Sequence, residues 1–251
     1  MKPNLSLLKY SKQIVGSLAM ALILPAVSHA AGWNIDPLRV DLTNNKKTAV
    51  ITITNDSTAP TTIQIQPIAW SQVEGKEIYT PTKDLLVSPP IVTIAPKTSQ
   101  IIRLALRKVA DPTKELSYRI NLQEIATTNA DNVSGVQVAL RIGIPVFVQP
   151  LSGKSQPKLS WKVGLVADNM IKLELRNEGT AHVKITDLVL SSVGQEQAIA
   201  NEIGSSYILP DQAHVWFLKP SMTENFANGH FHLKAFTDSI NVDTVIVVEK
   251  P

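Results

Sequence analysis

Two histidines separated by one residue, His230 and His232, form the only short pattern in the sequence that could bind a metal ion. Alternate residues of a strand share a face, so both imidazoles would point the same way. A protein zinc site uses three or four ligands, and the chain has no cysteine and no obvious third ligand close to this pair. We therefore expect no metal site and interpret the pair as partly exposed residues on an outward strand face.

Residues that could carry out catalysis are scattered rather than grouped. The sequence contains no Gly-x-Ser-x-Gly elbow, no glycine-rich phosphate loop and no His-Glu-x-x-His motif. His182 and His214 are isolated, and the sequence does not pair carboxylates such as Asp36, Glu74 and Glu115 for acid–base work. The absence of cysteine excludes thiol catalysis and iron–sulfur clusters. We predict no enzyme and no cofactor; a hydrolase is the alternative that these absences disfavour.

The charge of the chain is concentrated at its beginning. Residues 1–30 contain Lys2, Lys9 and Lys12 and no acidic residue, and these three lysines account for the whole formal net charge of +3. The remaining chain is formally neutral, which disfavours binding of nucleic acid through bulk charge.

Residues 1–30 have the pattern of a signal peptide. The lysines precede an apolar run over residues 14–24, and Ser28-His29-Ala30 matches the small-residue cleavage pattern. The run is shorter than the roughly 20 residues that span a bilayer, so we expect export to the periplasm and no membrane insertion; a retained anchor is the alternative.

The rest of the sequence predicts strands almost throughout. Alternating apolar and polar residues occur at 49–54, 62–66 and 99–106, and further strand patterns follow at 116–125 and 136–148. In 99–106 the pattern places Ile102, Leu104 and Leu106 on one face and Arg103 on the other. Because short strands alternate with turn signals, we predict an all-β fold of two tandem immunoglobulin-like β-sandwich domains.

A change in composition marks the boundary between the two domains. Residues 151–157 have linker chemistry and no apolar periodicity. The predicted organisation is a signal peptide at 1–30, a first domain at 31–150, the linker and a second domain at 158–251. Each domain has the size that is usual for an immunoglobulin-like sandwich.

The strand predicted over 135–148 is about twice the usual five or six residues in length. The alternation places Val136, Val138, Leu140, Ile142 and Ile144 on one face. Such a strand ordinarily packs against the core of its own sandwich. Alternatively its first half is an exposed apolar edge, which favours aggregation unless another chain pairs with it.

In this context the exported part of the chain resembles the periplasmic chaperones of the chaperone–usher pilus pathway. The resemblance is strongest from Pro37 to Pro150 and rests on order and spacing. Its residues are Arg39, Ile51–Asn55, Pro89–Pro96, Ile101–Leu104, Glu115-Leu116, Asn121–Ile125 and the long strand that reaches Phe147.

The resemblance implies a non-enzymatic chaperone for pilus or fimbrial subunits. In this family a long chaperone strand fills the gap left by a missing strand of the subunit, with alternate side chains in its groove, and an outer-membrane usher receives the subunit. Matched onto this chain, the donated side chains would be Val136, Val138, Leu140 and Ile142. Self-association of the unloaded chain is left open.

The resemblance also implies an anchor for the C-terminal carboxylate of the subunit. Arg39 matches the first of the two basic anchors of the family, but Pro145 stands where the second anchor, a lysine, is usual. Arg103 or Arg107 is expected to replace that lysine, with Arg141 as a further candidate. For Arg103 the resemblance also implies a structural ion pair with Glu115.

A secreted adhesive or carbohydrate-binding sandwich is the alternative from another class of protein. Such a module would need an aromatic platform or a polar pocket in its loops. Only 5% of the residues are aromatic, and the tryptophans at 33, 70, 161 and 216 are dispersed.

Overall fold

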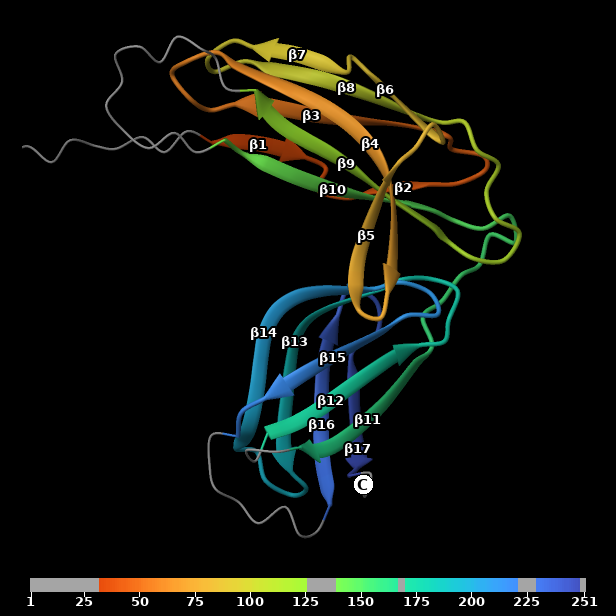
Figure 1. Cartoon of the computed structure of the whole chain (residues 1–251), viewed down its shortest axis with the longest axis vertical. Coiled ribbons are helices and arrows are strands. Elements are labelled where there is room, and N and C mark those ends of the chain that lie inside the picture. Colours follow the sequence, from red (N-terminus) through yellow and green to blue (C-terminus); the bar gives the residue numbers. More distant parts are fainter. Residues whose placement is uncertain (1–31, 126–138, 167–169, 221–228, 249–251) are drawn as a thin grey trace, which may run out of the picture. The chain divides into compact units, whose positions relative to one another are not determined.

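The computed structural model describes residues 32–125, 139–166, 170–220 and 229–248, and these residues form strands and connections without an α-helix (Figure 1). Two immunoglobulin-like β-sandwiches follow one another, as predicted, and together form one compact unit that begins at Trp33. No helix in the described part of the chain could cross a membrane. The predicted signal peptide and two predicted donor residues, Val136 and Val138, lie outside the described residues.

The first sandwich consists of two sheets. One sheet has the strand order β1-β3-β8-β6, and the other has the order β2-β10-β9-β4-β5, with β7 paired to β4. The strands are β1 (Trp33–Asp36), β2 (Val40–Leu42), β3 (Thr48–Asn55), β4 (Thr61–Val73), β5 (Lys76–Pro81), β6 (Leu85–Ser88), β7 (Ile91–Ile94), β8 (Ser99–Leu106), β9 (Leu116–Ile125) and β10 (Arg141–Val148).

The core between these sheets follows from the alternation in the sequence. In β8 the side chains of Ile102, Leu104 and Leu106 are buried, whereas Arg103 between them is exposed, as predicted. Burying a side chain of this size stabilises the fold by about 1.5–3 kcal/mol. The three buried side chains of β8 therefore contribute substantially to the packing of the two sheets.

Strand β10 has an open edge in its first half. It pairs with β9 along its whole length, from Arg141 to Val148, but with β2 only from Val146 to Val148. Among the described strands, none pairs with residues 141–145 on the side away from β9. An unpaired edge exposes backbone donors and acceptors that another chain can use.

The second sandwich repeats the arrangement with fewer strands. Its sheets have the orders β11-β12-β15 and β14-β13-β16-β17. The strands are β11 (Leu159–Val166), β12 (Met170–Asn177), β13 (Val183–Ser192), β14 (Ala198–Ile208), β15 (Ala213–Leu218), β16 (His230–Thr237) and β17 (Val242–Val247).

A buried asparagine ends one strand in each sandwich. Asn55 closes β3 with a fully buried side chain, whose Nδ2 donates to the carbonyls of Ala59 at 2.8 Å and Ile94 at 3.0 Å. Its Oδ1 accepts a bond from the backbone N–H of Ser57 at 3.0 Å. The amide thus substitutes for backbone partners where the strand turns.

Asn177 has the same arrangement at the end of β12. Its Nδ2 donates to the carbonyls of Ala181 at 2.8 Å and Ile208 at 3.1 Å, and its Oδ1 accepts from the N–H of Gly179 at 3.0 Å. Lys158 also donates its backbone N–H to this Oδ1, at 3.2 Å. The first strand of the second sandwich is therefore fixed to this turn at its start.

The connection between the sandwiches is bonded to both of them. The N–H of Leu151 donates to the carbonyl of Asp111 at 2.8 Å, and the N–H of Thr180 donates to the carbonyl of Gln156 at 2.9 Å. A Cβ at Gly179 would lie 2.3 Å from the carbonyl oxygen of Gln156. The segment predicted as a linker is therefore held by backbone hydrogen bonds to each sandwich.

A small aromatic cluster forms the interface between the sandwiches. It contains the buried residues Trp70, Phe147 and Leu209 with the partly buried Tyr207. Gln72 of β4 adds two bonds across the interface, because its Nε2 donates to the carbonyl of Tyr207 at 2.7 Å and its Oε1 accepts the N–H of Leu209 at 3.0 Å.

Candidate functional site

Arg39 joins the two sandwiches where the chain crosses from β1 to β2. Its Nε donates to Oδ2 of Asp41 at 3.1 Å, and its Nη1 donates to Oδ2 of Asp238 at 2.9 Å. Asp238 follows β16 in the second sandwich. The Arg39 side chain keeps 42% of its surface exposed, so the guanidinium group is both paired and accessible.

His182 continues this series of charged groups into the interface. Its Nδ1 lies 2.6 Å from Oε1 of Glu115, and its Nε2 lies 3.6 Å from Oδ2 of Asp238. The ring stacks on Phe147, with the centroids 3.5 Å apart. The side chains of His182 and Glu115 are 9% and 6% exposed, so this contact is almost fully removed from water.

These contacts shift two titrations in opposite directions. Burial lowers the pKa of His182, but its hydrogen bonds to Asp238 and Glu115 outweigh burial, so the net pKa is raised. Burial raises the pKa of Asp238, but the bonds from His182 and from the backbone of Lys184 outweigh it, so the net pKa is lowered. Both shifts favour an imidazolium–carboxylate pair.

The predicted ion pair between Arg103 and Glu115 does not form. Arg103 lies in β8 of the first sheet, whereas Glu115 directly precedes β9 of the second sheet and pairs with His182. The two residues therefore lie on different parts of the sandwich, one within a strand and the other in a connection. Sequence reasoning missed His182 because it is isolated in the chain, 67 positions from its partner.

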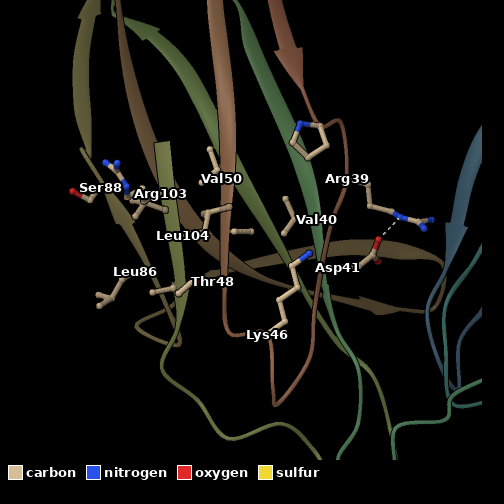
Figure 2. Close-up of a pocket in the computed structure, with 14 residues that line it drawn as sticks. Arg39, Val40, Asp41, Lys46, Thr48, Val50, Leu86, Ser88, Arg103 and Leu104 are labelled. Carbon is tan, nitrogen blue, oxygen red and sulfur yellow. Dashed lines mark hydrogen bonds and ion pairs between the residues drawn. The ribbon is translucent and has the colours of Figure 1, made fainter. Parts of the chain in front are cut away.

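A hollow of about 870 Å³ opens beside Arg39, and we call it the crossover hollow (Figure 2). Cationic residues on its wall are Arg39, Lys46 and Arg103, and the apolar residues on its wall include the exposed Val50 and Leu86. In Figure 2, Val40 and Lys46 lie between Arg103 and Arg39. The hollow combines cations with an apolar wall, which suits a ligand that carries both an anionic group and apolar side chains.

The structure thus brings two of the three predicted anchors, Arg39 and Arg103, to one hollow. Arg107 does not line it, and its backbone N–H donates to the carbonyl of Asp84 at 2.8 Å. Arg141 is exposed at the start of β10, outside the lining. Lys46 is a further cation that the sequence analysis missed, because it belongs to a turn without a motif.

Pro145 lies opposite Arg119 of the neighbouring strand β9. The Arg119 guanidinium stacks 4.1 Å above the Trp70 ring and 5.4 Å from the Tyr79 ring, and its Nε is buried without a hydrogen-bond partner. A cation held over aromatic faces is stabilised by their quadrupoles. No motif in the sequence marks this residue.

The two predicted donor residues that the structure describes, Leu140 and Ile142, differ in how they pack. The Ile142 side chain is half-buried and packs against the core of its own sandwich. Leu140 is also partly buried but is not part of that core. Its carbonyl accepts the N–H of Glu124 at 2.9 Å and its N–H donates to Oε2 of Glu124 at 3.1 Å, so the edge continues to this residue.

The remaining sequence-based candidates have structural roles. His232 contacts Asp243 at 2.5 Å, and the described residues include no group of three side chains that could hold a metal ion. Trp70 and Trp216 are buried, and Trp161 packs against the second core. These tryptophans form no exposed platform for a carbohydrate.

Comparisons with known proteins show what this chain resembles. Residues 32–154 match the family model described as "Pili and flagellar-assembly chaperone, PapD N-terminal domain". The chaperone protein PapD of Escherichia coli is 26% identical over 158 residues, which cover 61% of this chain and 64% of that relative. The match therefore spans a little under two thirds of the length of PapD.

Solved structures share the fold across most of the chain. A chain of the complex between the chaperone CsuC and the tip subunit CsuE, from archaic chaperone–usher pili of Acinetobacter baumannii, has a TM-score of 0.62 and 19% identity and covers 88% of this chain and 100% of its own. A chain of the complex between the SafA pilin and the SafB chaperone of Salmonella enterica has a TM-score of 0.59 and 14% identity, covering 88% and 98%.

Proposed function

We propose that this chain belongs to the pilus-assembly chaperones that it resembles, that it binds pilus or fimbrial subunits in the periplasm by donor-strand complementation, and that it delivers them to an outer-membrane usher. The family consists of chaperones and not of enzymes, which agrees with the scattered catalytic side chains.

The observation that carries the proposal is the open edge of β10 beside Arg39. Residues 141–145 have β9 on one side and no described strand on the other, and the ladder to β9 extends back to Leu140. A subunit strand that pairs with this edge would gain backbone hydrogen bonds, while side chains of Val136, Val138 and Leu140 would enter its groove. Each side chain contributes about 1.5–3 kcal/mol when fully buried, before the costs of ordering and association.

The crossover hollow supports an anchor for the subunit's carboxylate. The hollow includes Val40 and Asp41 of β2, the strand that borders β10. Arg39 would form charge-assisted bonds with the carboxylate and so fix the register of the paired strands. The second cation would be Arg103 or Lys46, which line the same hollow, rather than Arg107.

Recovery of subunits with the tagged full-length protein from the periplasm tests both parts of the proposal. Arg39→Ala should abolish the one-to-one complex because the carboxylate loses its anchor, and Arg176→Ala, an exposed arginine of β12, should retain it. Leu140→Glu should remain folded and fail to hold a subunit. Unchanged recovery with Arg39→Ala would remove the anchor, and an unfolded Leu140→Glu would show that Leu140 serves its own core.

A further inference from the structure

The proposed anchor is already occupied by carboxylates of its own chain. Arg39 donates to both Asp41 and Asp238, at 3.1 and 2.9 Å. A carboxylate that arrives from a subunit is a third negative charge at one guanidinium group. Arg39 can bind it strongly only if one of the internal carboxylates finds another positive partner.

Asp238 has such a partner within reach. Its Oδ2 is shared between Nη1 of Arg39 and Nε2 of His182, at 2.9 and 3.6 Å, while its Oδ1 accepts the backbone N–H of Lys184 at 2.9 Å. The Lys184 bond fixes Asp238 in place, so this carboxylate can be released from Arg39 without leaving the cluster. Only a protonated His182 would then balance its charge.

The other ionisable groups around His182 do not replace this proton. Glu115 faces Nδ1 and adds a negative charge. The Tyr207 ring lies 5.7 Å from the imidazole, and burial raises the pKa of this phenol, so it stays neutral. Lys184 and Arg119 are directed to the rings of Tyr207 and Trp70. With a neutral His182, the carboxylates of Asp41, Asp238 and the arriving subunit would share the single guanidinium group of Arg39.

We propose that His182 is a positioning residue for the anchor: as an imidazolium it holds Asp238 and frees Arg39 for a subunit carboxylate, and as a neutral imidazole it leaves Asp238 on Arg39. This inference rests on the proposed function and adds a pH dependence to it. The net upward shift of the His182 pKa agrees with this role, because the charged form then persists toward neutral pH.

Acetate is a suitable probe, since it is an ionised carboxylate throughout the relevant pH range. Its binding can be followed through the Cζ resonance of Arg39 in full-length protein labelled with ¹³C-arginine, which the spectrum of Arg39→Ala assigns. We expect acetate to bind Arg39 roughly fivefold to tenfold more weakly at about pH 8.5 than at about pH 5.5, the order of change expected from losing one nearby charge.

Two variants separate the explanations. His182→Gln should bind weakly at both pH values and lose the pH dependence, whereas His214→Gln, a half-buried histidine in β15 of the second sandwich, should behave like the wild type. Equal acetate affinity at both pH values in the wild type would overturn the role of His182 and leave the anchor standing. If acetate never shifts the Arg39 resonance, the anchor itself is contradicted.

Discussion

His182, Glu115 and Asp238 connect the two sandwiches through charge. Glu115 belongs to the first sandwich and His182 and Asp238 to the second, and the imidazole lies between the two carboxylates. Buried ion pairs stabilise a fold only when geometry and hydrogen bonds offset desolvation. Here the stacked Phe147 ring and the 2.6 Å contact to Glu115 supply that geometry.

The stability of the unloaded protein should therefore depend on pH in a defined direction. The raised pKa of His182 adds stability that is complete below its ordinary value of 6.5 and is lost as the pH rises through the folded-state value. The lowered pKa of Asp238 adds stability that is present above 3.8 and is lost as the pH falls through its folded-state value. We expect this contribution to be greatest in the mildly acidic window between these limits.

Urea unfolding at a series of pH values measures this dependence. The difference in unfolding free energy between the wild type and His182→Gln should shrink as the pH rises above neutrality, because both proteins then lack the imidazolium. A difference that is constant from acidic to alkaline pH would show that His182 contributes only through packing on Phe147.

At the scale of elements, the strands that the sequence predicted best are those with strict alternation. β8 and β9 have the predicted bounds, Ser99–Leu106 and Leu116–Ile125, because one face of each strand is committed to the core. The long strand was harder, since its apolar alternation extends on the N-terminal side of Ile142, beyond the residues that pack against the core of their own sandwich. Periodicity reports that one face is apolar, and it does not report which chain covers that face.

The turns at Asn55 and Asn177 yield a prediction about element ends. Asn55→Ala and Asn177→Ala should each lower the free energy of unfolding by about 2–4 kcal/mol, because each removes a buried amide and leaves backbone groups unpaired. Denaturant unfolding measures the loss. Asn45→Ala, in the exposed turn before β3, should change stability by less than about 0.5 kcal/mol. A loss as small as that of Asn45→Ala would show that water replaces the amide.

At the scale of the whole molecule, the sequence could predict two sandwiches but not how they communicate. Arg39 was identified through a resemblance, and its partner Asp238 is 199 positions away. Arg103 and Glu115 were paired by analogy, yet Arg103 lies in β8 and Glu115, just before β9, contacts His182. Contacts between distant segments depend on the turn geometry of the intervening chain, which has no periodic signal.

Phe147 provides a test of this communication. Its ring is almost fully buried and contacts Trp70, Tyr207 and His182. Phe147→Ala should cost about 3–5 kcal/mol and separate thermal unfolding into two steps, because the sandwiches lose their shared aromatic cluster.

Calorimetry distinguishes this outcome from simple destabilisation. Phe217→Ala, an exposed aromatic of β15, should leave one transition at nearly the wild-type temperature. A single cooperative transition in Phe147→Ala would mean that the charged groups and Gln72 suffice to couple the sandwiches.

Gly179 has a role that no side chain could fill. A methyl group here would collide with the main chain of Gln156 and Lys158, at 2.3 and 2.4 Å, and would displace the connection between the sandwiches from its position. Even an alanine at this position would disturb the neighbouring Thr180, whose N–H donates to the carbonyl of Gln156 and whose carbonyl accepts the N–H of Glu115 in the first sandwich. The lack of a Cβ at residue 179 thus allows the connection to pack closely against the second sandwich.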